Sequence, residues 1–241
     1  MNKLLLAISG LILLAGSAFA DSTNVGVKLS YGNFDAAGSH TTNRAGVGST
    51  AIAFVDGKTG GPAVNASGDA TFPFASIFIE REKEFSKGNI AVGLDYIPLS
   101  AEIDSIPGGN AADGTGATVE VGNQMTLYIQ PSKELSNGVK VFGKLGYSRM
   151  DLDITGLKRQ AVTNVGSGAT SSTDTSASKD LDGIMIGLGF EKSMSVGPLD
   201  FVRLEATFTD YEKVSHTNSN GKVISADADL TAINLSVGKK F

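Results

Sequence analysis

The sequence predicts an all-β fold, an eight-stranded antiparallel up-and-down transmembrane β-barrel, and three observations predict it. Eight segments alternate between apolar residues and small or polar residues with a period of two. The connections between these segments alternate between short turns and long polar stretches. After residue 20, no stretch approaches the roughly 18 uninterrupted apolar residues of a membrane-spanning helix. A closed barrel is the other structure that satisfies its backbone groups inside a bilayer.

The first 20 residues have the pattern of a secretory signal peptide. A short basic start at Lys3 precedes an apolar run over residues 4–15, and Ala18-Phe19-Ala20 forms a small-residue cleavage site. An N-terminal membrane anchor is the alternative, but this run is shorter than the roughly 20 residues that an anchor needs. We therefore expect residues 1–20 to be cleaved and residues 21–241 to form one exported barrel domain.

Each predicted strand sets an apolar face against a small or polar face. In the first strand, Val25, Val27, Leu29 and Tyr31 alternate with small or polar neighbours. Such strands have lipid on one side and a polar lumen on the other. The eight predicted strands cover residues 25–32, 72–85, 90–96, 119–129, 139–147, 183–190, 202–209 and 232–241.

The connections predict which end of the barrel faces outward. The short ones are residues 85–89, 135–139 and 193–198, and Asn137-Gly138 in the second favours a type I′ hairpin. The long ones are residues 37–70, 101–117, 155–180 and 212–227. Long loops of bacterial barrels face the exterior, so both termini are expected in the periplasm. A soluble β-sandwich is the alternative fold, but it does not require this long-short order.

The last strand carries a candidate assembly signal. Ile233, Leu235, Val237 and the terminal Phe241 share one face, with Lys239 where an aromatic residue is common. This ending resembles the C-terminal signal of outer-membrane barrels. Together with the strand pattern and the segment FVRLEATFTDY at residues 201–211, it resembles the small outer-membrane barrel family that includes opacity proteins, OmpX and the OmpA transmembrane domain. The resemblance implies the bacterial outer membrane, contact with lipid and lipopolysaccharide, insertion by the barrel-assembly machinery, and no cofactor.

Composition narrows the function further. The chain has 25 acidic and 20 basic residues and a net charge of −5, which argues against a nucleic-acid partner. It has no cysteine, which excludes disulfides, thiol catalysis and thiolate metal sites.

The inward positions near mid-strand carry three cations and three anions. Because unpaired buried charge is costly, we expect them to pair and to plug the lumen, with a gated polar channel as the alternative. These residues are Lys28, Glu80, Asp95, Lys144, Arg203 and Glu205.

Other side chains offer weaker signals. His40 and His216, the only histidines, lie in predicted external loops, so we expect no enzyme. The acidic residues Asp174, Asp180 and Asp182 invite Ca²⁺ but lack regular ligand spacing. Aromatic residues near the strand ends predict two girdles at the membrane interfaces. The outer girdle comprises Phe34, Phe72, Tyr96, Tyr147 and Tyr211, and the periplasmic one comprises Phe85, Phe190, Phe201 and Phe241.

The pattern therefore predicts a structural surface barrel that displays four long external loops, with adhesion or envelope integrity as its role and a possible external ligand at the loops. A narrow porin-like channel for small solutes is the alternative. An enzyme acting on envelope lipids is the third hypothesis.

Overall fold

The computed structural model describes residues 21–42, 52–54, 64–98, 100–103, 118–157, 162–164, 170–171, 175–217 and 222–241. The signal-peptide prediction concerns residues 1–20, which lie outside this range, so it stays a prediction. Among the described residues, every regular element is a β-strand. None of the described residues belongs to a helix of the length and hydropathy that crossing a bilayer requires.

Eight long strands form the wall of the molecule. They are β1 (Ser22–Thr42), β3 (Val64–Phe85), β4 (Gly88–Ile97), β6 (Thr118–Glu134), β7 (Val139–Leu157), β10 (Thr175–Val196), β11 (Leu199–Thr217) and β12 (Lys222–Lys240). The short strand β5 (Ala101–Ile103) adds to the edge of β6. The short strands β2 (Ile52–Phe54), β8 (Val162–Asn164) and β9 (Thr170–Ser171) make a separate small sheet.

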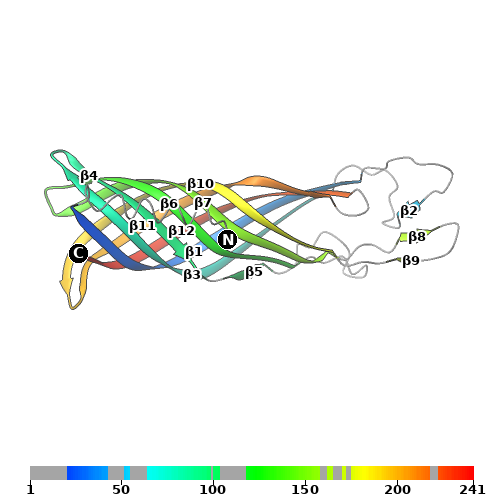
Figure 1. Cartoon of the computed structure of the whole chain (residues 1–241), viewed down its shortest axis with the longest axis horizontal. Helices are drawn as coiled ribbons and strands as arrows, with labels where there is room; N and C mark the ends of the chain where they lie inside the picture. The colour runs from blue at the N-terminus through cyan, green and yellow to red at the C-terminus, as the bar shows by residue number, and fades with distance from the viewer. Residues whose placement is uncertain are drawn as a thin grey trace.

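The eight long strands close into a ring, because β4 also pairs with β6. Figure 1 shows the resulting barrel from the side. Each pairs antiparallel with its neighbours, and β12 returns to pair with β1 along its whole length. At the end of this seam the Thr23 N–H donates to the Phe241 carbonyl at 2.9 Å, and the Phe241 N–H donates to the Thr23 carbonyl at 2.8 Å. The predicted eight-stranded antiparallel barrel is confirmed.

The strands are longer than the sequence pattern predicts. Stretches assigned to the four long connections are in part strand: β1 continues to Thr42, β11 to Thr217, and β12 begins at Lys222. These stretches consist mostly of small, polar or charged residues with few large apolar side chains, so an alternation with an apolar outer face does not reveal them. Antiparallel ladders with neighbouring strands satisfy backbone groups here, as in the pairing of Thr42 with Lys222 and of Thr217 with Val223.

The three predicted short turns are confirmed, but one has a different geometry. The Gly138 N–H donates to the Leu135 carbonyl at 3.0 Å, and the Leu135 N–H donates to the Val139 carbonyl at 2.8 Å. Gly138 has a φ of 71°, whereas Asn137 is not among the residues with positive φ. A type I′ turn needs positive φ at both central residues, so this is a type I turn followed by a left-handed glycine bulge. The prediction of type I′ is wrong.

Two β-bulges change which side chains face inward toward the end of the barrel opposite the C-terminus. In β6 the register with β7 shifts between Gly122 and Met125, and Asn123 has a positive φ of 48°. Val121 therefore faces the lumen and is buried, although unbroken alternation predicts it on the lipid face with Met125. A second shift lies in β11, between Tyr211 and Val214.

Candidate functional site: the lumen and the outer wall

The centre of the lumen is occupied by Arg203, which β11 projects inward between two carboxylates. Its Nη2 lies 2.7 Å from Glu80 Oε1 and 2.6 Å from Glu191 Oε2, and its Nη1 lies 3.2 Å from Glu80 Oε2. Glu80 also accepts from the Tyr128 hydroxyl at 2.8 Å and from the Asn24 amide at 3.0 Å. Glu80 is 0% exposed and Arg203 is 2% exposed, so this ion pair is fully desolvated.

The other predicted lumen charges also meet in pairs. Lys144 Nζ lies 2.5 Å from Glu205 Oε2, and the Lys28 ammonium forms an ion pair with Asp95. The structure thus brings the six residues together as three ion pairs, each joining one cation to one anion. The sequence pattern predicts the six positions but not the partners. We name this set the lumen network.

Three further charges extend the lumen network toward the C-terminal end of the barrel. Lys140 Nζ lies 3.0 Å from Glu82 Oε2 and 3.2 Å from Glu191 Oε1. Both carboxylates are buried. The sequence prediction considered only mid-strand positions and omitted these three residues. Lys140 and Glu82 lie four and two residues from the predicted lumen charges Lys144 and Glu80, and Glu191 lies two residues from the inward Gly189. Extending the period-two alternation to the strand ends would have found them.

Aromatic rings fill the space around the network. Arg203 Cζ lies 5.1–5.3 Å from the ring centroids of Phe78, Phe142 and Phe201, and Lys144 Nζ lies 4.3 Å from that of Tyr128. Such contacts stabilise a desolvated cation. Tyr128 fits because its neighbour across the strand pair is Gly93, where a Cβ would meet the ring at 2.4 Å. Rings and ion pairs together line this part of the lumen.

Farther along the axis the interior becomes apolar. A buried cluster is formed by Phe34, Val121, Met150, Leu152, Leu181, Tyr211, Ala228 and Leu230. The sequence places Phe34 and Tyr211 in the outer aromatic girdle, but each is only 2% exposed and faces inward. Phe72 packs against the same cluster, and Phe201, predicted for the periplasmic girdle, lies in the lumen. These four girdle assignments are wrong, because the position of a ring near the end of a strand does not determine whether it faces the lumen or the outside. The side on which a ring lies follows from the alternation of its own strand, in which even-numbered residues face inward on β1 and β3 and odd-numbered ones on β11.

The outer wall around the lumen network is apolar. Leu188 is 73% exposed, and large apolar side chains recur on all the neighbouring strands. They include Val27, Leu29, Tyr31, Ile77, Leu145, Ile184, Ile186, Leu204, Ile233 and Leu235. An exposed apolar belt of this extent around a closed barrel is typical of a lipid-facing surface.

The candidate assembly signal forms part of this belt. Ile233 and Leu235 are exposed on it, and the terminal Phe241 side chain is 70% exposed. Val237 is half-buried on the same face, opposite Val27 of β1. The residues thus offer an apolar edge at one end of the barrel.

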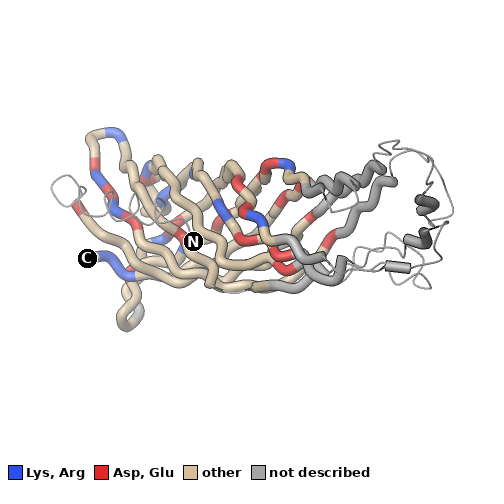
Figure 2. The backbone as a smooth tube through the Cα atoms, turned by 45° about the vertical axis from the view of Figure 1, so that its right-hand side comes forward, with Lys and Arg blue, Asp and Glu red and all other residues tan. Residues whose placement is uncertain are grey.

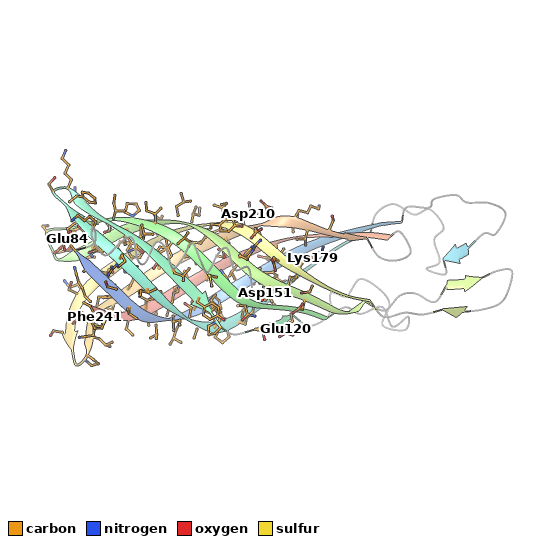
Figure 3. The ribbon with its side chains drawn as sticks, in the orientation of Figure 1. Glu84, Glu120, Asp151, Lys179, Asp210 and Phe241 are labelled. Carbon is orange, nitrogen blue, oxygen red and sulfur yellow. The ribbon has the colours of Figure 1, made fainter. Side chains whose placement is uncertain are left out.

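Beyond the belt the outer wall becomes acidic, where the interior becomes apolar. Asp69, Asp35, Asp229 and Asp210 lie opposite one another across β3, β1, β12 and β11. Other acids continue this outer surface on β6, β7 and β10 and farther along β11 and β12: Glu120, Asp151, Asp153, Asp180, Asp182, Glu212 and Asp227. We name these eleven residues the acidic belt. Figure 3 shows Glu120, Asp151 and Asp210 far from Phe241. Figure 2 shows acidic residues recurring on the half of the barrel away from the C-terminus.

Repulsion within the acidic belt is reflected at Asp229. Partial burial and the neighbouring Asp210, Asp227 and Asp35 carboxylates raise the pKa of Asp229 above its ordinary value. Arg149 relieves part of the charge on the other side of the barrel, since its guanidinium forms two hydrogen bonds with Asp182, at 2.7 and 2.8 Å. The inside and outside of the barrel therefore exchange polarity along its axis. In the section around the lumen network, the interior is polar and the outer wall is apolar. In the section of the acidic belt, the interior is apolar and the outer wall is polar, as in a water-soluble protein.

Replacing Asp229 with Asn is expected to stabilise the acidic section. A like charge directly opposite another on a sheet costs about 0.2–1 kcal/mol, and Asn removes it. Because the folded-state pKa of Asp229 is raised, the cost grows as pH rises above the unfolded-state value and vanishes below it. Melting curves of wild type and Asp229→Asn should therefore separate at pH 7 and coincide at about pH 3. A difference that persists unchanged at pH 3 would contradict the electrostatic explanation.

The structure places the histidines in strands and not in loops. His40 lies in β1 and His216 in β11, and both pair with Ile224 of β12, so β12 separates them. Asp180 and Asp182 form ion pairs with Arg149, at 3.9 and 2.7 Å. Asp174 lies outside the described residues. Among the residues that the structure describes, no group of three or more potential ligands could hold a metal ion.

No protein-family model matches the chain, and neither does any curated protein sequence. Solved structures with a similar fold include the attachment invasion locus protein Ail of Yersinia pestis, in complex with the heparin analogue sucrose octasulfate. It has a TM-score of 0.38, 9% identity and coverage of 91% of this chain and 99% of that one. Neisserial surface protein A has a TM-score of 0.32 and 13% identity, covering 88% and 97%.

The outer membrane protease OmpT from Escherichia coli has a TM-score of 0.41 and 12% identity, covering 91% of this chain and 97% of that one. Similarity at this level assigns no activity, ligand or partner to the chain. The closed eight-stranded ring is itself the architecture that the sequence resemblance to opacity proteins, OmpX and the OmpA transmembrane domain implies.

Proposed function

We propose that the protein is a structural surface barrel of the bacterial outer membrane. It spans the membrane with its apolar belt and displays its strand extensions and external loops outside the cell. The single observation that carries this proposal is the exchange of polarity along one continuous set of strands. The section with an apolar outer wall needs lipid, and the section with an acidic outer wall and apolar interior needs water. In this reading the short turns and both ends of the mature chain lie in the periplasm.

A display role is supported by the paired charges of the lumen. The buried charges pair within hydrogen-bond distance, and aromatic rings fill the space between them. Loops and strand tips on a rigid scaffold are where binding usually resides, so adhesion or envelope integrity follows from the same architecture. The partners of this proposal are outer-membrane lipid and lipopolysaccharide, the barrel-assembly machinery and an external ligand. The proposal involves no enzyme reaction.

A narrow channel for small solutes is the second candidate, and a specific observation favours it. Several buried polar atoms of the lumen have no protein partner: Ser30 Oγ, Ser76 Oγ, Asp95 Oδ1 and both amide atoms of Gln130. Buried polar groups are usually satisfied by protein or by ordered water, so these atoms are suited to line a thin path for water. Conductance of the purified protein in a planar bilayer separates the two functions. The display role predicts no steady conductance, and the channel predicts a stable one.

The orientation is tested by labelling single cysteines, since the natural chain has none. Lys179→Cys lies beside the acidic belt, whereas Lys87→Cys lies in the β3–β4 turn near Glu84, at the opposite end (Figure 3). On intact cells a membrane-impermeant maleimide is expected to label Lys179→Cys and to leave Lys87→Cys unlabelled until the outer membrane is permeabilised. The reverse result would show that the barrel is inserted the other way round, and labelling of both would exclude a spanning barrel.

A further inference from the structure

The border of the apolar belt at the C-terminal end of the barrel carries outward-facing cations. On β3, Ile77 faces outward, and the same alternation brings Arg81 and Lys83 to the outer wall. On β12, Lys239 follows Val237 in the same way. Among the residues that the structure describes, five cations occupy such positions at this end: Arg81, Lys83, Lys133, Lys192 and Lys239. We name them the cationic rim, and Figure 2 shows Lys and Arg residues in this part of the barrel.

Arg81 lies against the wall where β3 meets β1. It pairs with Thr23, and its Nη1 donates to the Thr23 hydroxyl at 2.6 Å. The Arg81 Nε, which neighbouring groups cover, has no acceptor among the described residues, so the Thr23 contact satisfies only part of the guanidinium. Phosphate oxygens accept guanidinium N–H groups in pairs, with a charge-assisted geometry that a single hydroxyl does not offer. The unused donors of Arg81 are therefore suited to an anionic oxygen ligand.

Acids compensate the cationic rim only in part. Lys83 Nζ lies 2.8 Å from Asp21 Oδ1, and Lys239 Nζ lies 3.7 Å from Asp200 Oδ2. All four side chains are 40–46% exposed, and ion pairs this exposed contribute little to stability, so the lysines can exchange these partners for others. In the described part of the chain, the five cations of the rim face these two outward acids, which leaves a net charge of +3 on this border.

The two borders of the apolar belt thus carry opposite charge. The border away from the C-terminus is the acidic belt, as with Asp35 and Asp69 opposite each other on β1 and β3. A zwitterionic lipid headgroup has no net charge with which to distinguish the two borders. An anionic headgroup is attracted to the cationic rim and repelled by the acidic belt. The charge pattern therefore favours an anionic lipid at one border of the apolar belt and disfavours it at the other.

We propose that the cationic rim binds the headgroups of anionic phospholipids, with Arg81 and Lys239 as the principal contacts on either side of β1. The acyl chains then lie along the apolar belt, beginning at Val25, which pairs with Lys239. This inference rests on the proposed function, because it needs the apolar belt to lie in a bilayer. It does not depend on which way round the barrel is inserted, since it concerns one border of the belt.

The test uses single tryptophans, since the natural chain has none. Val25→Trp places the probe at the cationic rim, and Tyr31→Trp places it on the same face of β1 toward Asp35. Each barrel is reconstituted in mixed phosphatidylcholine and phosphatidylglycerol, with brominated acyl chains on one lipid or the other. Bromine quenches tryptophan on contact, so the two mixtures report which lipid lies beside the probe. We expect Val25→Trp to prefer phosphatidylglycerol by about fivefold and Tyr31→Trp to show no such preference.

Variants in the Val25→Trp barrel locate the binding. The double variant Arg81→Gln with Lys239→Gln is expected to abolish the preference for phosphatidylglycerol. Arg149→Gln is the matched control, because it removes a cation from the other border and should leave the preference unchanged. Quenching by brominated phosphatidylcholine alone shows that each variant has folded and inserted. A preference that survives the double variant, or that is equal at both tryptophans, would overturn the proposal.

Free phosphate is the other source of the same ligand chemistry. Replacing sodium chloride with sodium phosphate at equal ionic strength should leave the preference intact. Its loss in phosphate alone would assign the rim to the free ion and overturn the lipid proposal. Normal quenching at both tryptophans without any headgroup preference would overturn this proposal and leave the membrane-spanning barrel standing. If neither brominated lipid quenched either tryptophan, the apolar belt would not face lipid, and the proposed function would fail with it.

Discussion

Replacing Arg203 with alanine is expected to destabilise the barrel by about 3–5 kcal/mol, because it leaves Glu80 and Glu191 buried without their cation. Glu80 is completely buried, so water cannot easily replace the guanidinium. The measurement is the melting of the folded barrel in detergent, followed as the loss of β-sheet circular dichroism.

Arg149→Ala is the matched control for this substitution. Arg149 also binds a carboxylate in two-pronged fashion, at 2.7 and 2.8 Å from Asp182, but on the outer wall where both groups remain partly exposed. Its loss should cost no more than about 1 kcal/mol. If Arg203→Ala melts like Arg149→Ala and shows altered ion selectivity in a bilayer, the lumen is hydrated and the channel function replaces the display function.

Phe241→Ala is expected to block assembly while leaving the finished barrel nearly as stable as the wild type. The ring is 70% exposed at the end of the apolar belt, so little packing is lost when it is removed. The Phe241 backbone bonds to Thr23 do not depend on the side chain. In cells the variant should accumulate as degraded or periplasmic protein, measured by fractionation. After refolding into detergent it should melt within about 1 kcal/mol of the wild type.

Phe190→Ala is the control, since Phe190 is another exposed aromatic residue on the outer wall, at 57% exposure, but lies inside the chain. It should reach the outer membrane normally. Normal surface levels of Phe241→Ala would contradict the assembly role, and equal loss of both variants would indicate that any apolar ring of the belt is needed.

How far the sequence predicted the structure depends on whether one side of each strand faces lipid. Where it does, alternation is strict, and the positions of Lys28, Glu80 and Arg203 follow from counting by two. Where the outer wall is acidic and the interior apolar, the same period persists with its polarity reversed. Phe34 then suggests a ring at the membrane interface, although it is buried on the inner face of β1.

The remaining errors come from backbone irregularity and from distance in the sequence. A single extra residue at Gly122–Met125 turns Val121 inward, and nothing in the apolar pattern marks it. The partner of each lumen charge depends on how eight strands close. Arg203 and Glu80 are 123 positions apart, so period and composition carry no information about their contact.

The continuity of the long strands also sets how high the protein stands above its membrane. β11 and β12 each have 19 residues. At about 3.3 Å per residue and a tilt of about 40°, such a strand rises close to 50 Å, and the apolar band of an outer-membrane barrel takes up about 25 Å of that rise. Roughly 20 Å of hydrogen-bonded wall would then stand clear of the lipid. In the proposed orientation, a rigid wall of that height would hold the strand tips well above the lipid surface, so a binding partner would not need to reach the membrane itself.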